Sequence, residues 1–376
     1  MKYVFLLSIS ILTMACQPKK SPPMPKAESP QGTLYDIYVG TYTEKENFVN
    51  GKGEGIYNIQ LDSSLNEVGR RVIKGIKNPS FLALSYDNKY LYAVEELNPN
   101  GNICSYNTEY QEVKQLSRVS SHGDSPCHIA LNYHYRGDGQ ENLLMSANYM
   151  GGNVALFEIK NGVLSEAIDS LKFEGKGKTA RQEASHPHEV VYNNRQTWSV
   201  TDLGLDQIHV VYHNDKNLRL GKKSNEDYEI VAGSGPRHIV EDRYLLNELN
   251  STINVYTVED KPKKLQTIST LPSDYKGKNS TAEIQATKDF VYASNRGHNS
   301  IAMYKKRTDG ALENIGYELS RGEFPRNFNI SPDGKYLFCG NQNSDNIVIF
   351  SIKNDGKLAF VKEIKVNTPV CILFKR

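Results

Sequence analysis

Short apolar runs recur along the chain at a nearly constant spacing. Each unit opens with a proline, or once an alanine, followed by a short apolar run, and successive openings lie 43 to 61 residues apart. The openings begin at Pro79, Pro126, Pro187, Pro236, Ala282, Pro325 and Pro369. A period of about 40 to 50 residues is typical of β-propeller blades. The spacing therefore predicts seven structural repeats.

Within each unit the pattern predicts four antiparallel strands. The opening run is followed by a polar turn and a second apolar run, as at 86–89 before 90–94 and at 332–335 before 336–338. A third run begins with a β-branched residue, at Ile103, Val154, Ile208, Ile253, Ile301 and Ile347. A weaker fourth run completes the unit. Helical periodicity of useful length is absent beyond the N-terminal leader, so we expect an all-β fold.

The two ends of the repeat region complement each other. Residues 35–39 and 55–59 have the patterns of a second and a third strand, so the N-terminal unit lacks a first strand. Residues 369–374 supply a first strand with nothing after it. Pairing of these ends would close the ring and remove exposed sheet edges. We therefore predict a seven-bladed β-propeller over residues 34–376, closed by pairing of the N- and C-terminal segments.

The first 15 residues have the features of an export signal. A lysine precedes an apolar run too short to span a bilayer, and Thr-Met-Ala precedes Cys16. This context resembles a bacterial lipoprotein signal, in which the cysteine is acylated. Residues 16–33 are rich in proline and lysine and too polar to fold. We predict a signal peptide over 1–15, a lipidated Cys16, a tether over 16–33 and a cell-envelope location, with an ordinary cleaved signal as the alternative.

Composition narrows the partners that the protein can have. The formal net charge is +2, and removal of Lys2 with the signal leaves 2 − 1 = +1. So small a charge gives no long-range attraction to nucleic acid or to a membrane surface. We therefore expect a small-molecule partner, no nucleic acid, and membrane contact only through the lipid anchor.

The cysteines and the known motifs give no sign of a metal or cofactor. No zinc spacing or nucleotide-binding motif is found, so we expect neither. An oxidising envelope permits a disulfide, but the sequence does not identify a pair. The cysteines that follow Cys16 are Cys104, Cys127, Cys339 and Cys371.

The repeat brings distant polar residues to one rim. In a propeller, the start of the first strand and the end of the second meet at one end of the central channel, where ligands usually bind. His188 and Arg237 lie at the start of first strands in adjacent units. Glu248 and Arg296 lie at equivalent positions, where the second strands of adjacent units end. We expect these side chains to converge, either as a reactive site or as a structural ion-pair network.

Neighbouring repeat positions supply further candidates. The substrate-binding candidates are His128, His186, Asp202, His238, Glu283, Arg326 and Gln342. The recurring Asn or Asp at the end of second strands, such as Asp202, is alternatively a turn former. His128 and His238 lie one position further along their strands and could instead pack in the channel wall.

Seven short motifs occur in order between about residues 35 and 374. They are Gly40-Thr41-Tyr42, His186-Pro187-His188, Thr201–Asp206, Gly235–His238, Glu248-Leu249-Asn250, Ser294–Gly297 and Asn341-Gln342. Together they resemble the seven-bladed propeller lactonase family, which includes propeller-type 6-phosphogluconolactonases and fungal carboxymuconate cyclases. The resemblance implies a catalytic set of one His, two Arg and one Glu. By motif, these are His188, Arg237, Glu248 and Arg296.

The resemblance implies metal-independent hydrolysis of a sugar-type lactone, with a lactone or sugar acid as the ligand. His188, expected to titrate near neutral pH, could take a proton from water. Arg237 and Arg296 could hold a carboxylate or phosphate and counter an oxyanion, with Glu248 orienting them. Two alternatives stay open: cyclisation of an unsaturated dicarboxylate to a lactone, and a non-catalytic envelope propeller that binds glycans or proteins.

Overall fold

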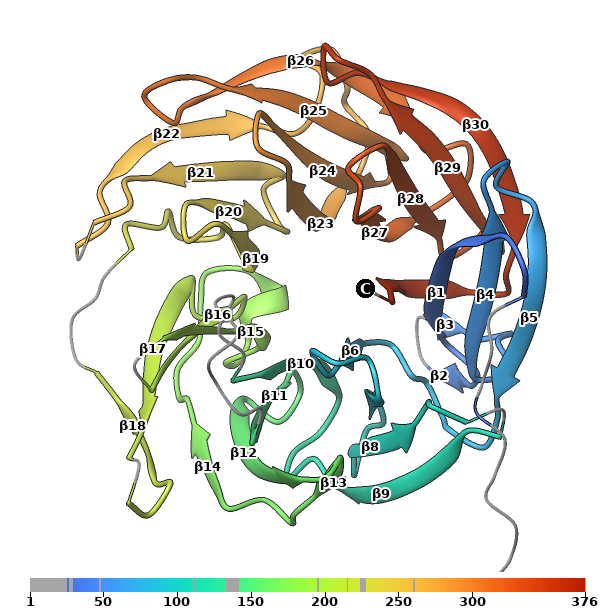
Figure 1. The fold of residues 1–376 in the computed structure, drawn as a ribbon. Coiled ribbons are helices and arrows are strands. Elements are labelled where there is room, and N and C mark those ends of the chain that lie inside the picture. The colour runs from blue at the N-terminus through green and yellow to red at the C-terminus, as the bar shows by residue number, and fades with distance from the viewer. Residues whose placement is uncertain are drawn as a thin grey trace, which may run out of the picture.

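The computed structural model describes residues 26, 30–46, 49–110, 112–132, 142–194, 196–214, 216–223, 228–259 and 261–375. The predicted signal peptide, Cys16 and most of the predicted tether lie outside these residues. Seven antiparallel sheets of four or five strands surround a common axis (Figure 1). The prediction of an all-β, seven-bladed propeller is therefore confirmed.

Each blade runs from an inner strand near the axis to an outer strand. Blade one contains β31 (Pro369–Phe374), β1 (Thr33–Thr41), β4 (Ile56–Asp62) and β5 (Glu67–Ile73). Blade two contains β6 (Leu82–Leu84), β7 (Tyr90–Glu95), β8 (Asn102–Asn107) and β9 (Lys114–Ser120). Blade three contains β10 (Pro126–Leu131), β11 (Leu143–Asn148) and β12 (Asn153–Lys160), with β13 (Val163–Leu164) and β14 (Asp169–Lys172) both pairing with β12.

The remaining blades follow the same order. Blade four contains β15 (Pro187–Asn194), β16 (Thr197–Asp202), β17 (Gln207–His213) and β18 (Leu220–Lys222). Blade five contains β19 (Pro236–Val240), β20 (Tyr244–Asn247), β21 (Thr252–Tyr256) and β22 (Lys264–Ser269). Blade six contains β23 (Ser280–Ala286), β24 (Phe290–Arg296), β25 (Ser300–Lys306) and β26 (Leu312–Leu319). Blade seven contains β27 (Pro325–Ile330), β28 (Tyr336–Asn341), β29 (Asn346–Ile352) and β30 (Leu358–Lys365).

Two short elements lie outside the blades. A two-stranded hairpin joins β2 (Lys45–Glu46) to β3 (Val49–Asn50). A 3-10 helix, η1 (Ala180–Gln182), lies in the long connection between β14 and β15. Within the described ranges, no helix is long and apolar enough to cross a bilayer.

The two ends of the chain close the ring within one sheet. The C-terminal strand β31 pairs with β1, with Ile37 opposite Phe374 and Val39 opposite Ile372. Figure 1 shows β31 on the axis side of β1. The inner strand β31 also contacts β27 on one side and β6 on the other. The predicted closure is therefore present, and it fixes the neighbours of every inner strand.

Apolar side chains pack between neighbouring blades, so each sheet is covered by the sheets on either side of it. Val39 of blade one, for example, shares a cluster with Phe338 and Ile349 of blade seven. Hairpin turns follow the predicted chemistry, since Asn88 (φ 58°) and Gly334 (φ 71°) adopt left-handed conformations. The four described cysteines are buried free thiols: Cys104, Cys127, Cys339 and Cys371.

Candidate active site

Four side chains from blades four, five and six meet at one end of the ring. His188 and Arg237 are the second residues of β15 and β19, Glu248 follows β20, and Arg296 ends β24. We call these four residues the central cluster. Each is between 3% and 6% exposed. The closed ring therefore buries together charges that lie far apart in the sequence.

Glu248 is the hub of the central cluster. Its Oε2 accepts hydrogen bonds from Arg237 Nη1 at 2.7 Å and pairs with Arg296 Nη2 at 2.9 Å. Its Oε1 accepts a bond from Arg181 Nη2 at 3.2 Å. Burial alone would raise the pKa of Glu248, but the guanidinium charges of Arg296, Arg237 and Arg181 outweigh it and hold that pKa well below its usual range. Glu248 is therefore an anion that orients three cations.

The two buried arginines are also anchored to the backbone of blade six. Arg237 Nε donates to the carbonyl of Ala282 at 2.6 Å, and Arg296 Nη2 donates to the carbonyl of Thr281 at 2.6 Å. Burial lowers the pKa of Arg296 to about 9, against the opposing effect of Glu248. This value is above neutrality, so the Arg296 guanidinium is charged at pH 7.

His188 is held as a neutral imidazole. Arg237 Nη1 lies within hydrogen-bond distance of His188 Nε2, and a guanidinium can only donate. Nε2 therefore carries the lone pair and Nδ1 carries the proton. Burial, reinforced by the charge of Arg237, lowers the pKa of His188 well below its ordinary value of 6.5. The expectation that this histidine titrates near neutral pH is therefore wrong.

Arg181 and Tyr149 belong to the site and were not identified from the sequence. Arg181 lies in η1 and donates to both Glu248 and the Tyr149 hydroxyl, the latter at 3.0 Å. Its side chain is 57% exposed, so this side of the cluster is open to solvent. Tyr149 holds the repeat position equivalent to that of Glu248, which was a usable signal. Arg181 has no counterpart in other blades, so the repeat could not reveal it.

Arg326 approaches the central cluster from blade seven. It is the second residue of β27, and its guanidinium lies 5.1 Å from the centre of the Tyr42 ring. The Tyr42 hydroxyl donates to Glu96 Oε2 at 2.9 Å. Arg326 is half-buried. Its guanidinium forms no hydrogen bond or ion pair within the part of the chain that the structure describes. It is therefore a cation whose hydrogen-bonding capacity is still available.

Gln342 follows β28 at the position predicted from the repeat. Its backbone amide donates to the carbonyl of Phe324 at 3.0 Å, and its side-chain amide donates to Asn343 at 3.2 Å. Phe324 in turn lies 5.1 Å from the Arg296 guanidinium. Gln342 thus supports the rim through Phe324, and its side-chain nitrogen is directed to Asn343.

Several polar side chains lower in the channel cap backbone groups of the next blade. His128 Nδ1 accepts a bond from the amide of Val190 at 3.4 Å, and Asn327 Oδ1 accepts one from the amide of Ile372 at 2.8 Å. Inner strands expose edge amides to the channel, and buried amides need partners. We therefore assign His128 a structural role in place of the substrate contact predicted from sequence.

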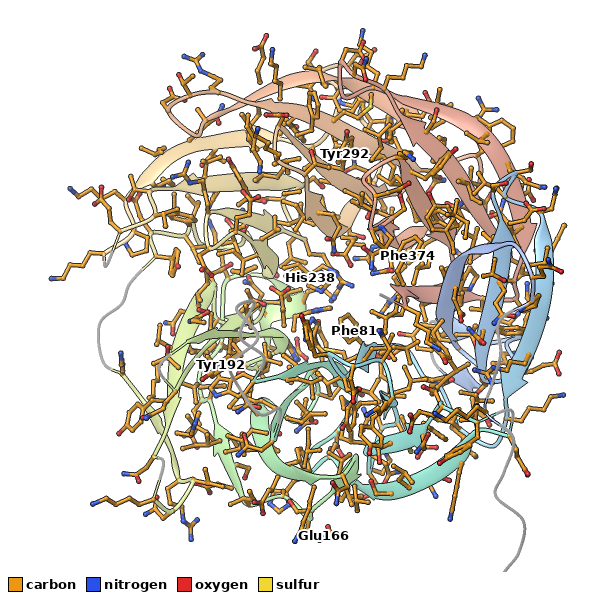
Figure 2. The ribbon with its side chains drawn as sticks, in the orientation of Figure 1. Phe81, Glu166, Tyr192, His238, Tyr292 and Phe374 are labelled. Carbon is orange, nitrogen blue, oxygen red and sulfur yellow. The ribbon has the colours of Figure 1, made fainter. Side chains whose placement is uncertain are left out.

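His238 and Glu283 form a second interblade pair in the channel wall. His238 lies close to the ring axis in Figure 2, whereas Glu166 lies at the outer edge. His238 Nδ1 lies 3.1 Å from Glu283 Oε1, which also accepts a bond from the amide of Ile284 at 3.0 Å. These contacts give both residues a structural role, and the predicted substrate contacts of His238 and Glu283 are not supported.

His186 and Asp202 hold the loop below the central cluster. Asp202 is fully buried, and its carboxylate accepts bonds from the backbone amide of His186 at 2.8 Å and from the Ser185 hydroxyl at 2.6 Å. The His186 ring stacks on Tyr149 with centroids 4.4 Å apart. Both residues position the loop and the tyrosine, and the bonds of Asp202 agree with the turn-former alternative for that residue.

Over the described ranges, no group of three or more His, Cys, Asp or Glu side chains is arranged to hold a metal ion. The positive charges at the central cluster are those of its arginines.

Comparison with known proteins identifies the family. The family model "Lactonase, 7-bladed beta-propeller" matches residues 36–374. A Bacillus subtilis protein named 6-phosphogluconolactonase is 29% identical over 362 residues, covering 91% of this chain and 99% of that protein. A protein of the same name from Formosa agariphila is 31% identical over 333 residues, covering 84% and 91%.

A solved structure of a lactonase is also similar to this chain. The Pseudomonas aeruginosa periplasmic gluconolactonase has 25% sequence identity and a TM-score of 0.80, with 90% of this chain and 98% of that one covered. The resemblance inferred from the motifs is thereby confirmed. The chain belongs to the seven-bladed β-propeller lactonase family.

Proposed function

We propose that the protein hydrolyses an anionic, sugar-type lactone without a metal, using the central cluster. The observation that carries this proposal is the excess of cations around one carboxylate and one neutral imidazole. Three guanidiniums contact Glu248, and Arg326 adds a fourth positive charge that acts on Glu248 electrostatically. Such charges can counter the oxyanion of ester hydrolysis and hold an anionic substituent. The names of the relatives from Bacillus subtilis and Formosa agariphila support the same substrate class.

Substrate binding would release His188 for proton transfer. In the free protein, the Nε2 lone pair of His188 is occupied by the Nη1 donor of Arg237. When the lactone carbonyl oxygen accepts that donor, Nε2 becomes free to accept a proton from water. The neutral state of His188 means that the base is already unprotonated at pH 7.

The remaining steps consume only the lactone and one water molecule. Water adds to the carbonyl carbon, its proton moves to His188 Nε2, and Arg237 and Arg296 stabilise the resulting oxyanion. The intermediate collapses by breaking the bond between the carbonyl carbon and the ring oxygen. His188 then returns the proton to that oxygen, and the open-chain hydroxy acid leaves. Glu248 stays ionised and keeps both guanidiniums in place.

The function is tested by following acid release from purified protein with a panel of lactones. We expect faster turnover of 6-phosphogluconolactone than of the uncharged gluconolactone, and no consumption of an unsaturated dicarboxylate. Consumption of a muconate with no lactone hydrolysis would favour the cyclase alternative. Glycan binding with neither activity would favour the non-catalytic propeller.

The pH profile tests the role of His188. Because kcat/KM reports the ionisation of the free enzyme, and the pKa of His188 is lowered, the acid limb should lie below pH 6.5. Activity should therefore persist as the pH falls from 7 to 6.5 and decline only in more acidic solution. His188→Gln should remove this limb and reduce kcat by about 100-fold or more. A limb centred above pH 6.5, or a His188→Gln enzyme with unchanged kcat, contradicts the assignment.

Export and lipidation form a separate part of the proposal. The periplasmic location stated for the Pseudomonas aeruginosa relative is consistent with it. In a bacterial host, the full chain should fractionate with membranes, and Cys16→Ala should move it to the soluble fraction. An unchanged distribution of the Cys16→Ala protein would rule out the anchor.

A further inference from the structure

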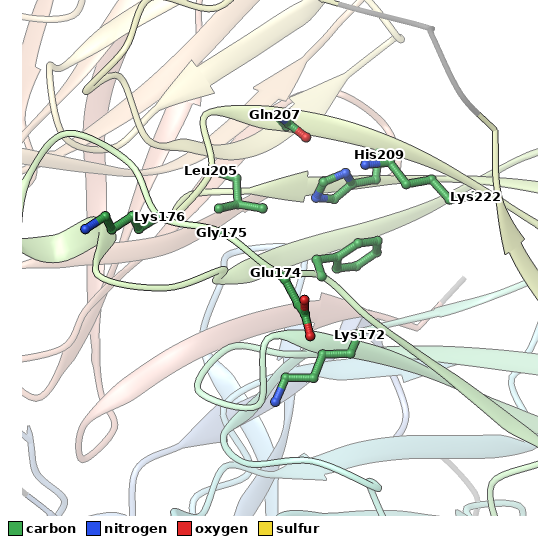
Figure 3. A pocket seen from close by; sticks show the side chains of 9 residues that line it. Lys172, Glu174, Gly175, Lys176, Leu205, Gln207, His209 and Lys222 are labelled. Carbon is green, nitrogen blue, oxygen red and sulfur yellow. The ribbon is translucent and has the colours of Figure 1, made fainter.

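A cavity lies in the outer part of the ring and shares no residue with the central cluster. It has a volume of about 370 Å³ and lies between the segment that follows β14 and strands β17 and β18. This volume falls within the range of ligand sites, about 300 to 1,000 Å³. Figure 3 shows His209 and Lys222 on one wall, with Glu174 and Lys172 on the other. We call this cavity the blade-four pocket.

The lining of the blade-four pocket is cationic. Lys172, Lys176 and Lys222 contribute three positive charges against the single negative charge of Glu174. None of these lysines forms an ion pair with another residue in the described ranges. Lysine ammonium groups with no carboxylate partner favour an anionic ligand.

A buried histidine provides a hydrogen-bonding group at the pocket wall. His209 is 1% exposed, and its ring stacks on Phe173 with centroids 3.9 Å apart. His209 Nε2 lies 3.0 Å from the Asp202 carboxylate, so Nε2 is the donor in that bond and Nδ1 is the ring nitrogen left to bond another group. His209 Nδ1 is buried and has no hydrogen-bond partner among the residues that the structure describes. An unsatisfied buried polar atom is costly, and a ligand hydroxyl, which can donate or accept, would satisfy it.

The same elements connect the pocket to the central cluster. Asp202 contacts His209 on the pocket side, and it contacts Ser185 and His186 below the cluster. The segment that starts at Lys172 in the pocket continues directly into η1, which carries Arg181. A ligand that orders the pocket wall would therefore act on the segment that positions Arg181.

We propose that the blade-four pocket binds a small hydroxylated anion, a sugar acid or sugar phosphate, and that its occupancy orders the segment carrying Arg181. The anionic group is held by Lys222 and Lys172, and a hydroxyl forms a hydrogen bond with His209 Nδ1. The pocket is separate from the site of lactone hydrolysis and does not depend on that activity.

Isothermal titration with gluconate and with glucose 6-phosphate tests the binding. The titrations use the Arg326→Met protein, because this substitution removes the guanidinium near the central cluster that could itself bind the anion. Adding Lys172→Met and Lys222→Met should weaken binding by at least about 10-fold for one or both probes. Lys160→Met, an exposed lysine on β12, is the matched control and should change the affinity by less than about twofold. The absence of binding up to about 10 mM, or unchanged affinity in the lysine variants, overturns the proposal.

Two further readouts locate the ligand without measuring activity. Trp198, the only tryptophan, packs in one cluster with Phe173 and Leu205 of the pocket lining, so its fluorescence should change on titration. Heat of binding with unchanged fluorescence and no sensitivity to the lysine variants would place the ligand elsewhere. Hydrogen exchange over residues 177–186 should slow when the probe binds, and unchanged exchange with the probe bound would overturn the link to Arg181.

Discussion

Replacing Arg237 with methionine is expected to lower kcat/KM for lactone hydrolysis by about 100- to 1,000-fold. Methionine keeps an unbranched apolar stem but removes the donor that contacts both His188 and Glu248. The oxyanion would then lose one of its two buried counter-charges. The measurement is steady-state acid release by the variant and the wild type on the preferred lactone.

Stability must be followed alongside activity, because breaking a buried ion pair costs about 3–5 kcal/mol. Arg118→Met is the matched control, since Arg118 pairs at 2.7 Å with Glu95, a buried carboxylate in blade two outside the cluster. We expect Arg118→Met to keep its activity even where its melting temperature falls. If folded Arg237→Met hydrolyses the lactone at the wild-type rate, Arg237 has no part in catalysis.

Replacing Arg326 with methionine is expected to change which lactone is preferred. Its guanidinium stacks on Tyr42 and forms no ion pair with a described carboxylate, so it can bind a phosphate or carboxylate of the substrate. Loss of one such charged contact should reduce kcat/KM for 6-phosphogluconolactone by about 10- to 100-fold. The uncharged gluconolactone should change by less than about threefold, so the ratio of the two values is the informative quantity.

Arg321→Met provides the control for this experiment. Arg321 also stacks on an aromatic ring, that of Phe360 at 4.5 Å, but it lies in the connection after β26 and its side chain is 50% exposed. We expect its substrate preference to match the wild type. Equal losses on charged and uncharged lactones in Arg326→Met would mean that Arg326 supports the site without recognising the anion.

The repeat in the sequence predicts the fold closely because blade formation depends on local patterning. The β-branched residues predicted to begin the third strands, such as Ile103 and Ile301, each lie one residue inside an observed strand. Closure also followed from the sequence, since an N-terminal unit without a first strand needs the partner that residues 369–374 supply.

The charged cluster was partly predictable for the same reason. His188, Arg237, Glu248 and Arg296 occupy repeat positions that closure brings together, and the structure places them in contact. Arg181 lies in an insertion specific to blade three, where the repeat gives no register. The protonation state of His188 depends on burial and on the donor from Arg237, and neither is encoded in the spacing.

The polar residues of the channel show that a repeat position alone does not reveal what a side chain contacts. His128 and His238 share a repeat position, and from the sequence this position could face a ligand or pack in the channel wall. In the structure, His128 caps a backbone amide and His238 pairs with Glu283 across two blades. Satisfying the inner strand edges requires polar side chains at these positions, whatever the ligand.

A crystal structure of the His188→Gln protein soaked with 6-phosphogluconate would show where the reaction takes place. We expect the sugar acid in the central cluster, with its carboxylate on Arg237 and Arg296 and its phosphate on Arg326. Density for the sugar acid elsewhere, with Arg237 still bonded to residue 188 and Arg326 unoccupied, would contradict this expectation.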